Sequence, residues 1–124
     1  MQKMITKVGL TVACTVFLSA LLVFPSQSQT GNYLYWGSPT LNTGSVRTGF
    51  DFASDALRLE GFSNIRRSAS EVTGSKGGTY VAITCVGTAP RVTAVVMVTG
   101  SNNAETAQVR DQVVRKIKGI IRFD

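Results

Sequence analysis

The pattern of apolar positions over residues 45–60 is that of an amphipathic helix. Apolar residues recur every three or four positions, which places them on one helix face. They are Val46, Phe50, Ala53 and Leu57. Gly61 predicts the helix end, because glycine there adopts the left-handed conformation and lets Phe62 fold back on Leu57. Gly49 weakens the pattern by about 1 kcal/mol relative to alanine, so the helix begins either at residue 45 or after Gly49.

Three later segments are predicted to be β-strands. Residues 79–86 direct Val81, Ile83 and Cys85 to one side and Tyr80, Ala82 and Thr84 to the other. Residues 91–99 direct Val92, Ala94, Val96 and Val98 to one side and Val95 and Met97 to the other. Residues 64–73 are charged and serine-rich, which suits the edge of a sheet. The glycine-rich residues 74–78, between the strands predicted over 64–73 and 79–86, predict a hairpin turn.

A second helix is predicted over residues 103–118. Asn102 and Glu105 have the spacing of a capping box at its start. Its apolar stripe is Val109, Val113, Ile117 and Ile120. The element order is then helix, three strands, helix. We expect an α+β domain in which both helices pack on one face of a three-stranded antiparallel sheet.

The N-terminal segment has the three parts of a secretory signal. Residues 1–7 are basic, residues 8–24 are apolar or small, and residues 25–30 are short and polar. We predict a signal peptide over 1–28 with cleavage after Ser28, and a protein that is secreted or periplasmic. Two alternatives remain: an uncleaved membrane anchor, and a lipoprotein modified at Cys14.

The remaining chain is one small domain with a mild positive charge. Of the 124 residues, 13 are basic and 7 acidic, and only two basic residues lie in 1–28, so the rest carries a formal charge of +4. This charge favours anionic surfaces. We expect an irregular arm over 29–44, whose Tyr33, Tyr35 and Trp36 either form a short edge strand or lie across the domain, and a folded domain over 45–124.

The ordered motifs resemble a group of small exported bacterial proteins of uncharacterised function. The motifs are Gly61-Phe62 after the first helix, then Val72-x-Gly74, then Gly78-x-Tyr80-Val81-Ala82-x-x-Cys85, then the valine-rich strand and the closing helix. The resemblance covers residues 46–118 and implies no activity. It implies that relatives carry a second cysteine near Gly49, bridged to the one that matches Cys85. Because this chain has glycine there, Cys85 is expected to be a free thiol.

Candidate chemistry is sparse. The chain has no histidine, which excludes histidine-based triads and metal sites. Cys85 lies on the predicted core face, so we expect a buried inert thiol, with an intermolecular disulfide or a reactive thiol as alternatives. Asp51 and Asp55 have the spacing of a cation or acid–base pair, but Arg47 and Arg58 lie within one helical turn and favour ion pairs.

The sheet face away from the helices is the candidate interaction surface. Val95 and Met97 lie on this face, where their side chains are either exposed to solvent or covered by a partner. The predicted surface comprises Tyr80, Val95, Met97, Arg66 and Arg91. We expect a non-enzymatic binding module without a cofactor. Its partner is an unknown protein, an anionic envelope ligand or a second copy; nucleic acid is not expected, nor a membrane once the signal is cleaved. The alternatives are a hydrolase-like or thiol-dependent enzyme, and a self-associating structural protein.

Overall fold

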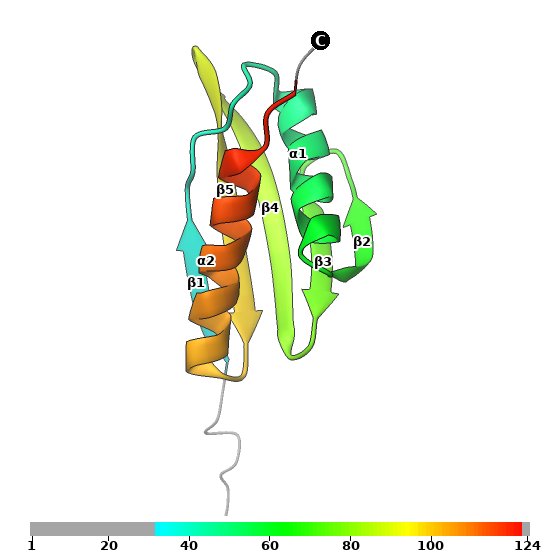
Figure 1. Ribbon diagram of the computed structural model, residues 1–124, viewed down its shortest axis with the longest axis vertical. Helices are drawn as coiled ribbons and strands as arrows, with labels where there is room; N and C mark the ends of the chain where they lie inside the picture. The colour runs from blue at the N-terminus through cyan, green and yellow to red at the C-terminus, as the bar shows by residue number, and fades with distance from the viewer. Residues whose placement is uncertain (1–31, 123–124) are drawn as a thin grey trace, which may run out of the picture. The chain divides into compact units, whose positions relative to one another are not determined.

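The computed structural model describes residues 32–122. The expected signal peptide, its cleavage after Ser28 and the alternative lipidation at Cys14 lie outside the described residues. Two helices lie side by side against an antiparallel sheet (Figure 1). The elements in chain order are β1 (Tyr33–Gly37), α1 (Val46–Leu59), β2 (Ser63–Arg67), β3 (Val72–Lys76), β4 (Thr79–Thr88), β5 (Arg91–Gly100) and α2 (Asn103–Gly119).

The sheet has five strands, so the prediction of a three-stranded sheet is wrong, although the α+β class stands. The strand order is β1-β5-β4-β3-β2, and every neighbouring pair is antiparallel. The long hairpin of β4 and β5 forms the centre, with ten residues in each strand. Strands β1 and β2 form the two edges, and both helices cover the same face.

The two additional strands come from segments with little periodic signal. Strand β1 arises within the segment that we expected to be irregular, where it pairs with β5 about 60 residues further along the chain. The segment expected to be one strand is divided by a turn. The Ser68 hydroxyl oxygen accepts the backbone N–H groups of Ser70 and Glu71, both at 3.2 Å. This turn forms a β2–β3 hairpin, and most of the expected glycine-rich turn becomes strand β3.

Capping residues fix the ends of α1. The Ser45 hydroxyl accepts the N–H of Thr48 at 3.2 Å, so the helix begins before Gly49 rather than after it. At the other end Gly61 has φ = 85°, and its N–H donates to the Arg58 carbonyl. The N–H of Phe62 donates to the Leu57 carbonyl, which completes a Schellman motif and confirms the predicted helix end.

The core lies between the sheet and the two helices. Most of its fully buried side chains come from the predicted inward positions of β4 and β5 and from the facing stripes of the helices; Leu41, between β1 and α1, and Val72 of β3 are also fully buried. The largest include Phe52, Leu57, Ile83, Val92, Val96, Val98, Val113 and Ile117. The period-two prediction for β4 and β5 is therefore confirmed, and it leaves the alternate residues of both strands on the opposite face.

Candidate functional site

The sheet face that the helices leave uncovered is the candidate site, and its side chains form continuous rows. Directly opposed residues of antiparallel strands lie on the same face of a sheet. One row crosses all five strands: Trp36, Met97, Ala82, Thr73 and Arg66. The adjacent row contains Leu34, Thr99, Tyr80 and Ser75. Thr84 pairs with Val95 in a third row. We call this set the open face.

Large apolar side chains are exposed along these rows. Trp36 is 61% exposed, Leu34 53% and Tyr80 51%. Met97 lies between Trp36 and Ala82 and is 37% exposed, and Val86 continues the apolar surface along β4. Among residues 32–122, no helix packs over this face (Figure 1). Large exposed apolar patches are rare on soluble proteins and mark interaction sites.

The centre of the open face carries no charge. From Tyr80 to Val86 of β4 and from Thr93 to Thr99 of β5, every outward residue is apolar or hydroxylated. The next outward pair, Thr88 and Arg91, lies at the end of the hairpin. Arg66 is the one charged residue in the three rows named above, and it lies on the edge strand β2. The basic residues of α2 belong to the helix layer, on the other side of the sheet.

The structure brings together only some of the residues that the sequence selected. Tyr80, Val95 and Met97 share the open face, as expected. Arg91 is occupied at the end of β5, where its guanidinium donates to Asn42 Oδ1 at 3.0 Å. Asn42 in turn donates to the backbone carbonyl at the end of α2, at 2.9 Å. Because β3 and β4 lie between β2 and β5, Arg66 and Arg91 do not form one basic patch.

Two residues of the open face were missed as part of this surface. Leu34 and Trp36 belong to β1, which the sequence analysis treated as an irregular arm. The available signal was that Leu34 and Trp36 lie on one face of a strand and Tyr35 on the other. Because both faces then carry large apolar or aromatic side chains, the alternation does not show which face is exposed. Only the pairing with β5 shows that Trp36 and Met97 are neighbours.

The outer edge of β1 is partly closed by α2. Arg110 Nη1 donates to the backbone carbonyl of Trp36 at 2.6 Å, and its Nε atom pairs with Asp111 at 2.7 Å. The guanidinium also lies over the ring of Tyr35, 5.6 Å from the centroid. The Trp36 carbonyl oxygen therefore has an intramolecular donor, which weakens this edge as a template for another strand.

Cys85 is a buried thiol on the core side of β4. It is 8% exposed, and burial raises the pKa of the Cys85 thiol to about 11. The thiol is therefore neutral near pH 7, where a catalytic cysteine needs to be a thiolate. A Cβ atom added at Gly49 of α1 would lie 3.2 Å from Cys85 Sγ and 3.4 Å from Cys85 Cβ.

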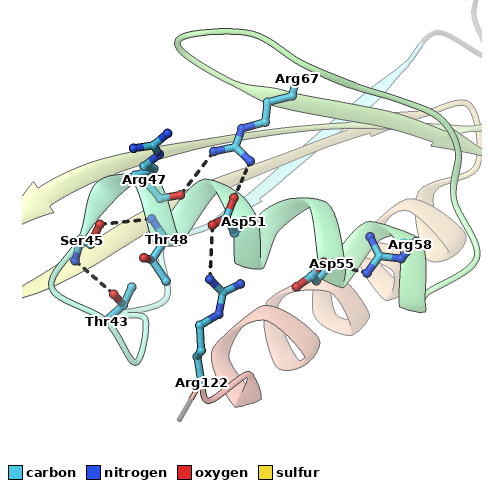
Figure 2. Close-up of polar contacts among 9 residues, drawn as sticks. All are labelled: Thr43, Ser45, Arg47, Thr48, Asp51, Asp55, Arg58, Arg67 and Arg122. Carbon is cyan, nitrogen blue, oxygen red and sulfur yellow. Dashed lines mark hydrogen bonds and ion pairs between the residues drawn. The ribbon is translucent and has the colours of Figure 1, made fainter. Parts of the chain in front are cut away.

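The carboxylates of α1 form ion pairs, with one change of partner (Figure 2). Asp51 accepts from Arg67 Nη1 of β2 at 2.6 Å and pairs with Arg122 Nη1 at 3.4 Å. The expected partner Arg47 instead contributes its backbone carbonyl, which accepts from Arg67. The hydrogen bond from Arg67 holds the pKa of the Asp51 carboxyl below its ordinary value. Asp55 pairs with Arg58 at 2.7 Å, as expected.

Hollows on the helix layer are shallow and polar. One of them has a volume of about 470 Å³ and lies between the C-terminal ends of the helices. It is lined by Glu60, Gln112, Arg115, Lys116, Gly119 and Ile120. Within that hollow Glu60 pairs with Lys116 at 3.6 Å. Over residues 32–122, no three histidine, cysteine or acidic side chains cluster as a metal site would require.

Comparison with known proteins gives no information about the site, so its role is argued from its geometry. The sequence matches no family model, and no curated protein matches it. Neither helix in the described part of the chain is long and apolar enough to cross a membrane.

Proposed function

We propose that this protein is a small exported binding module that acts through the open face of its sheet and catalyses no reaction. The observation that carries this proposal is the two adjacent rows that hold the exposed side chains of Trp36, Met97 and Tyr80, on a face with an uncharged centre. Export is supported by the basic, apolar and small-residue parts of the N-terminal segment.

The composition of the open face favours a protein partner. Tryptophan and tyrosine are enriched among the residues that contribute most to binding energy in protein interfaces. They supply a large contact area with few rotatable bonds, so ordering them on binding costs little entropy. Trp36 and Tyr80 are held in paired strands rather than in loops, so their backbones are already in place.

The uncharged centre also narrows the chemistry of the partner. Hydrogen bonds from cationic side chains are the strong contacts to an anionic ligand. Among the described residues, the three rows of the open face contain one cation, Arg66, at an edge, and Arg91 at the end of the hairpin is hydrogen-bonded to Asn42. The surface is instead complementary to an apolar, uncharged protein surface. The anionic envelope ligand considered from the net charge is therefore not the ligand that we propose for this face.

Photocrosslinking from the centre of the open face tests the proposed function. A photoreactive methionine analogue is placed site-specifically at residue 97 of the full chain, in cells that produce and export the protein. A discrete crosslinked adduct is expected. It should disappear when Trp36→Ser and Tyr80→Ser remove the aromatic side chains, because both belong to the same surface.

A substitution on the helix layer provides the matched control. Leu59 is 63% exposed at the end of α1, so Leu59→Ser removes a comparable exposed apolar side chain from the other side of the molecule. This variant should keep the adduct. A folded, exported protein that gives no adduct from residue 97 would contradict the proposed function, and so would an adduct that Leu59→Ser removes equally well.

A further inference from the structure

We propose that the partner covering the open face is a second copy of this chain, packed sheet against sheet. This inference rests on the proposed function, because it names the occupant of the same surface. Two sheets that pack face to face lie about 10 Å apart, with their side chains interdigitated. The dimer would form a two-layer β-sandwich with the helices of each copy on the outside.

The first argument is that the open face is compatible with itself. A twofold interface places the same patch of both copies in contact, so a patch whose charges are all of one sign repels its own copy. Like charges in contact cost several kcal/mol in an interface. Along the two central strands, the outward positions from Tyr80 to Val86 and from Thr93 to Thr99 carry no charge. The positive charge of α2 lies on the far side of the sheet.

The second argument is the size of the face. With about 4.8 Å between strands and about 3.4 Å per residue, the five strands present a face of roughly 600 Å² in each copy, taking the strand lengths given above. Two such faces bury about 1,200 Å² in total, which is the lower limit for stable specific interfaces. The projecting side chains of Trp36 and Tyr80 add to this area.

The third argument concerns the other route to a dimer, in which strands pair at a sheet edge. At β1 the carbonyl oxygen of Trp36 already accepts from Arg110 at 2.6 Å. Pairing of a second chain along this edge would have to displace that charge-assisted hydrogen bond. Face-to-face packing leaves the bond intact and buries Trp36 as well, so it is more favourable than strand pairing at β1.

Light scattering after size exclusion tests the inference, using the protein as it is exported from cells that produce the full chain. We expect twice the mass of one chain for the unchanged protein. Two charge variants are compared with it, one with Val86→Lys and Met97→Lys and the other with Val86→Glu and Met97→Glu. Val86 and Met97 are both exposed, so each variant should fold with an unchanged circular dichroism spectrum.

Each charge variant alone should lose the dimer, because identical charges would face one another. An equimolar mixture of the two should recover twice the mass of one chain, because opposite charges then meet across the interface. Leu59→Lys adds the same charge on the helix layer and should leave the dimer intact. Recovery in the mixture also shows that the variants are folded.

Three outcomes would overturn the inference. One is an unchanged protein that has the mass of one chain even at millimolar concentration. Another is a dimer that both charge variants retain. The last is a crosslink from residue 97 to the N-terminal segment of the same chain, which would show that this segment covers the face. If the protein is monomeric but residue 97 crosslinks to one other protein, the inference fails and the proposed function stands.

Discussion

At the scale of single residues, Asp51 connects three parts of the chain. Its carboxylate accepts from Arg67 of β2 and pairs with Arg122 beyond α2, while Asp51 itself belongs to α1 (Figure 2). Helical spacing suggested Arg47 as the partner, because sequence spacing reveals only neighbours on the same helix. The actual partners are 16 and 71 positions away.

Removing this carboxylate should weaken the fold in a pH-dependent way. The pKa of Asp51 is lowered from its ordinary value of 3.8. Its contribution is therefore present above about pH 4 and is lost as the pH falls through the lowered pKa. Asp51→Asn should reduce the free energy of unfolding by about 1 kcal/mol at neutral pH, and this difference from the unchanged protein should vanish in acid.

Urea unfolding at neutral and at strongly acidic pH measures the difference in the free energy of unfolding between Asp51→Asn and the unchanged protein at each pH. Asp55→Asn is the control, because it removes an ion pair that lies within α1 alone. An equal loss for Asp51→Asn at both pH values would show that the side chain acts through packing and not through its charge.

At the scale of elements, α1 approaches the sheet closely at Gly49. A Cβ atom there would lie 3.1 Å from Val92 Cγ1 and 3.2 Å from Cys85 Sγ. Glycine therefore lets the first turn of the helix rest directly on β4 and β5. The lost helix propensity, about 1 kcal/mol relative to alanine, is the cost of this contact. It also explains why the helix continues through a residue that the sequence analysis treated as a weak point.

Gly49→Cys should form a disulfide with Cys85. The Cβ–Cβ separation at this site is 3.4 Å, close to the 3.5–4.5 Å of disulfides. It is also compatible with the bridge that the resemblance implies for relatives. Closing the chain between these positions should raise the free energy of unfolding by about 4 kcal/mol. Mass spectrometry should show the loss of two hydrogens, and urea unfolding gives the stabilisation.

The reduced form of the variant is its internal control. With dithiothreitol present, Gly49→Cys should be less stable than the unchanged protein, because the added side chain crowds Val92 and Cys85 without a bond to offset the strain. Two free thiols after air oxidation would show that α1 and β4 are further apart than described.

At the scale of the whole molecule, the fold has one covered and one open side. Both helices of the described residues lie on one face of the sheet, so no described helix covers the other face. Side-chain burial alternates along β5, so two neighbouring residues lie on the two different faces of the sheet. Val96 is fully buried on the helix side, whereas Met97 is exposed on the open face. The same molecule thus contains a buried core and an exposed apolar surface.

The same substitution at these two neighbours should have opposite consequences. Val96→Lys places an unpaired charge in the core and should lower the free energy of unfolding by about 4 kcal/mol or more. Met97→Lys should change it by about 1 kcal/mol or less. Urea unfolding at low chain concentration compares them without a contribution from self-association. Similar losses for both variants would contradict the assignment of the two faces.

The sequence by itself determined both helices, the C-terminal end of α1, the N-cap of α2, the central β4–β5 hairpin and the direction in which its side chains point. These features depend on contacts between residues close in the chain, or on a period that a single segment displays. It did not determine the number of strands, because edge strands such as β1 and β2 are half-solvated and show little periodicity. Only the tertiary structure decided that Trp36 lies beside Met97, that Arg91 is held away from the open face, and that Asp51 pairs with Arg67 and Arg122. Each of these contacts joins residues distant in the chain, and their proximity is a consequence of how the sheet is ordered.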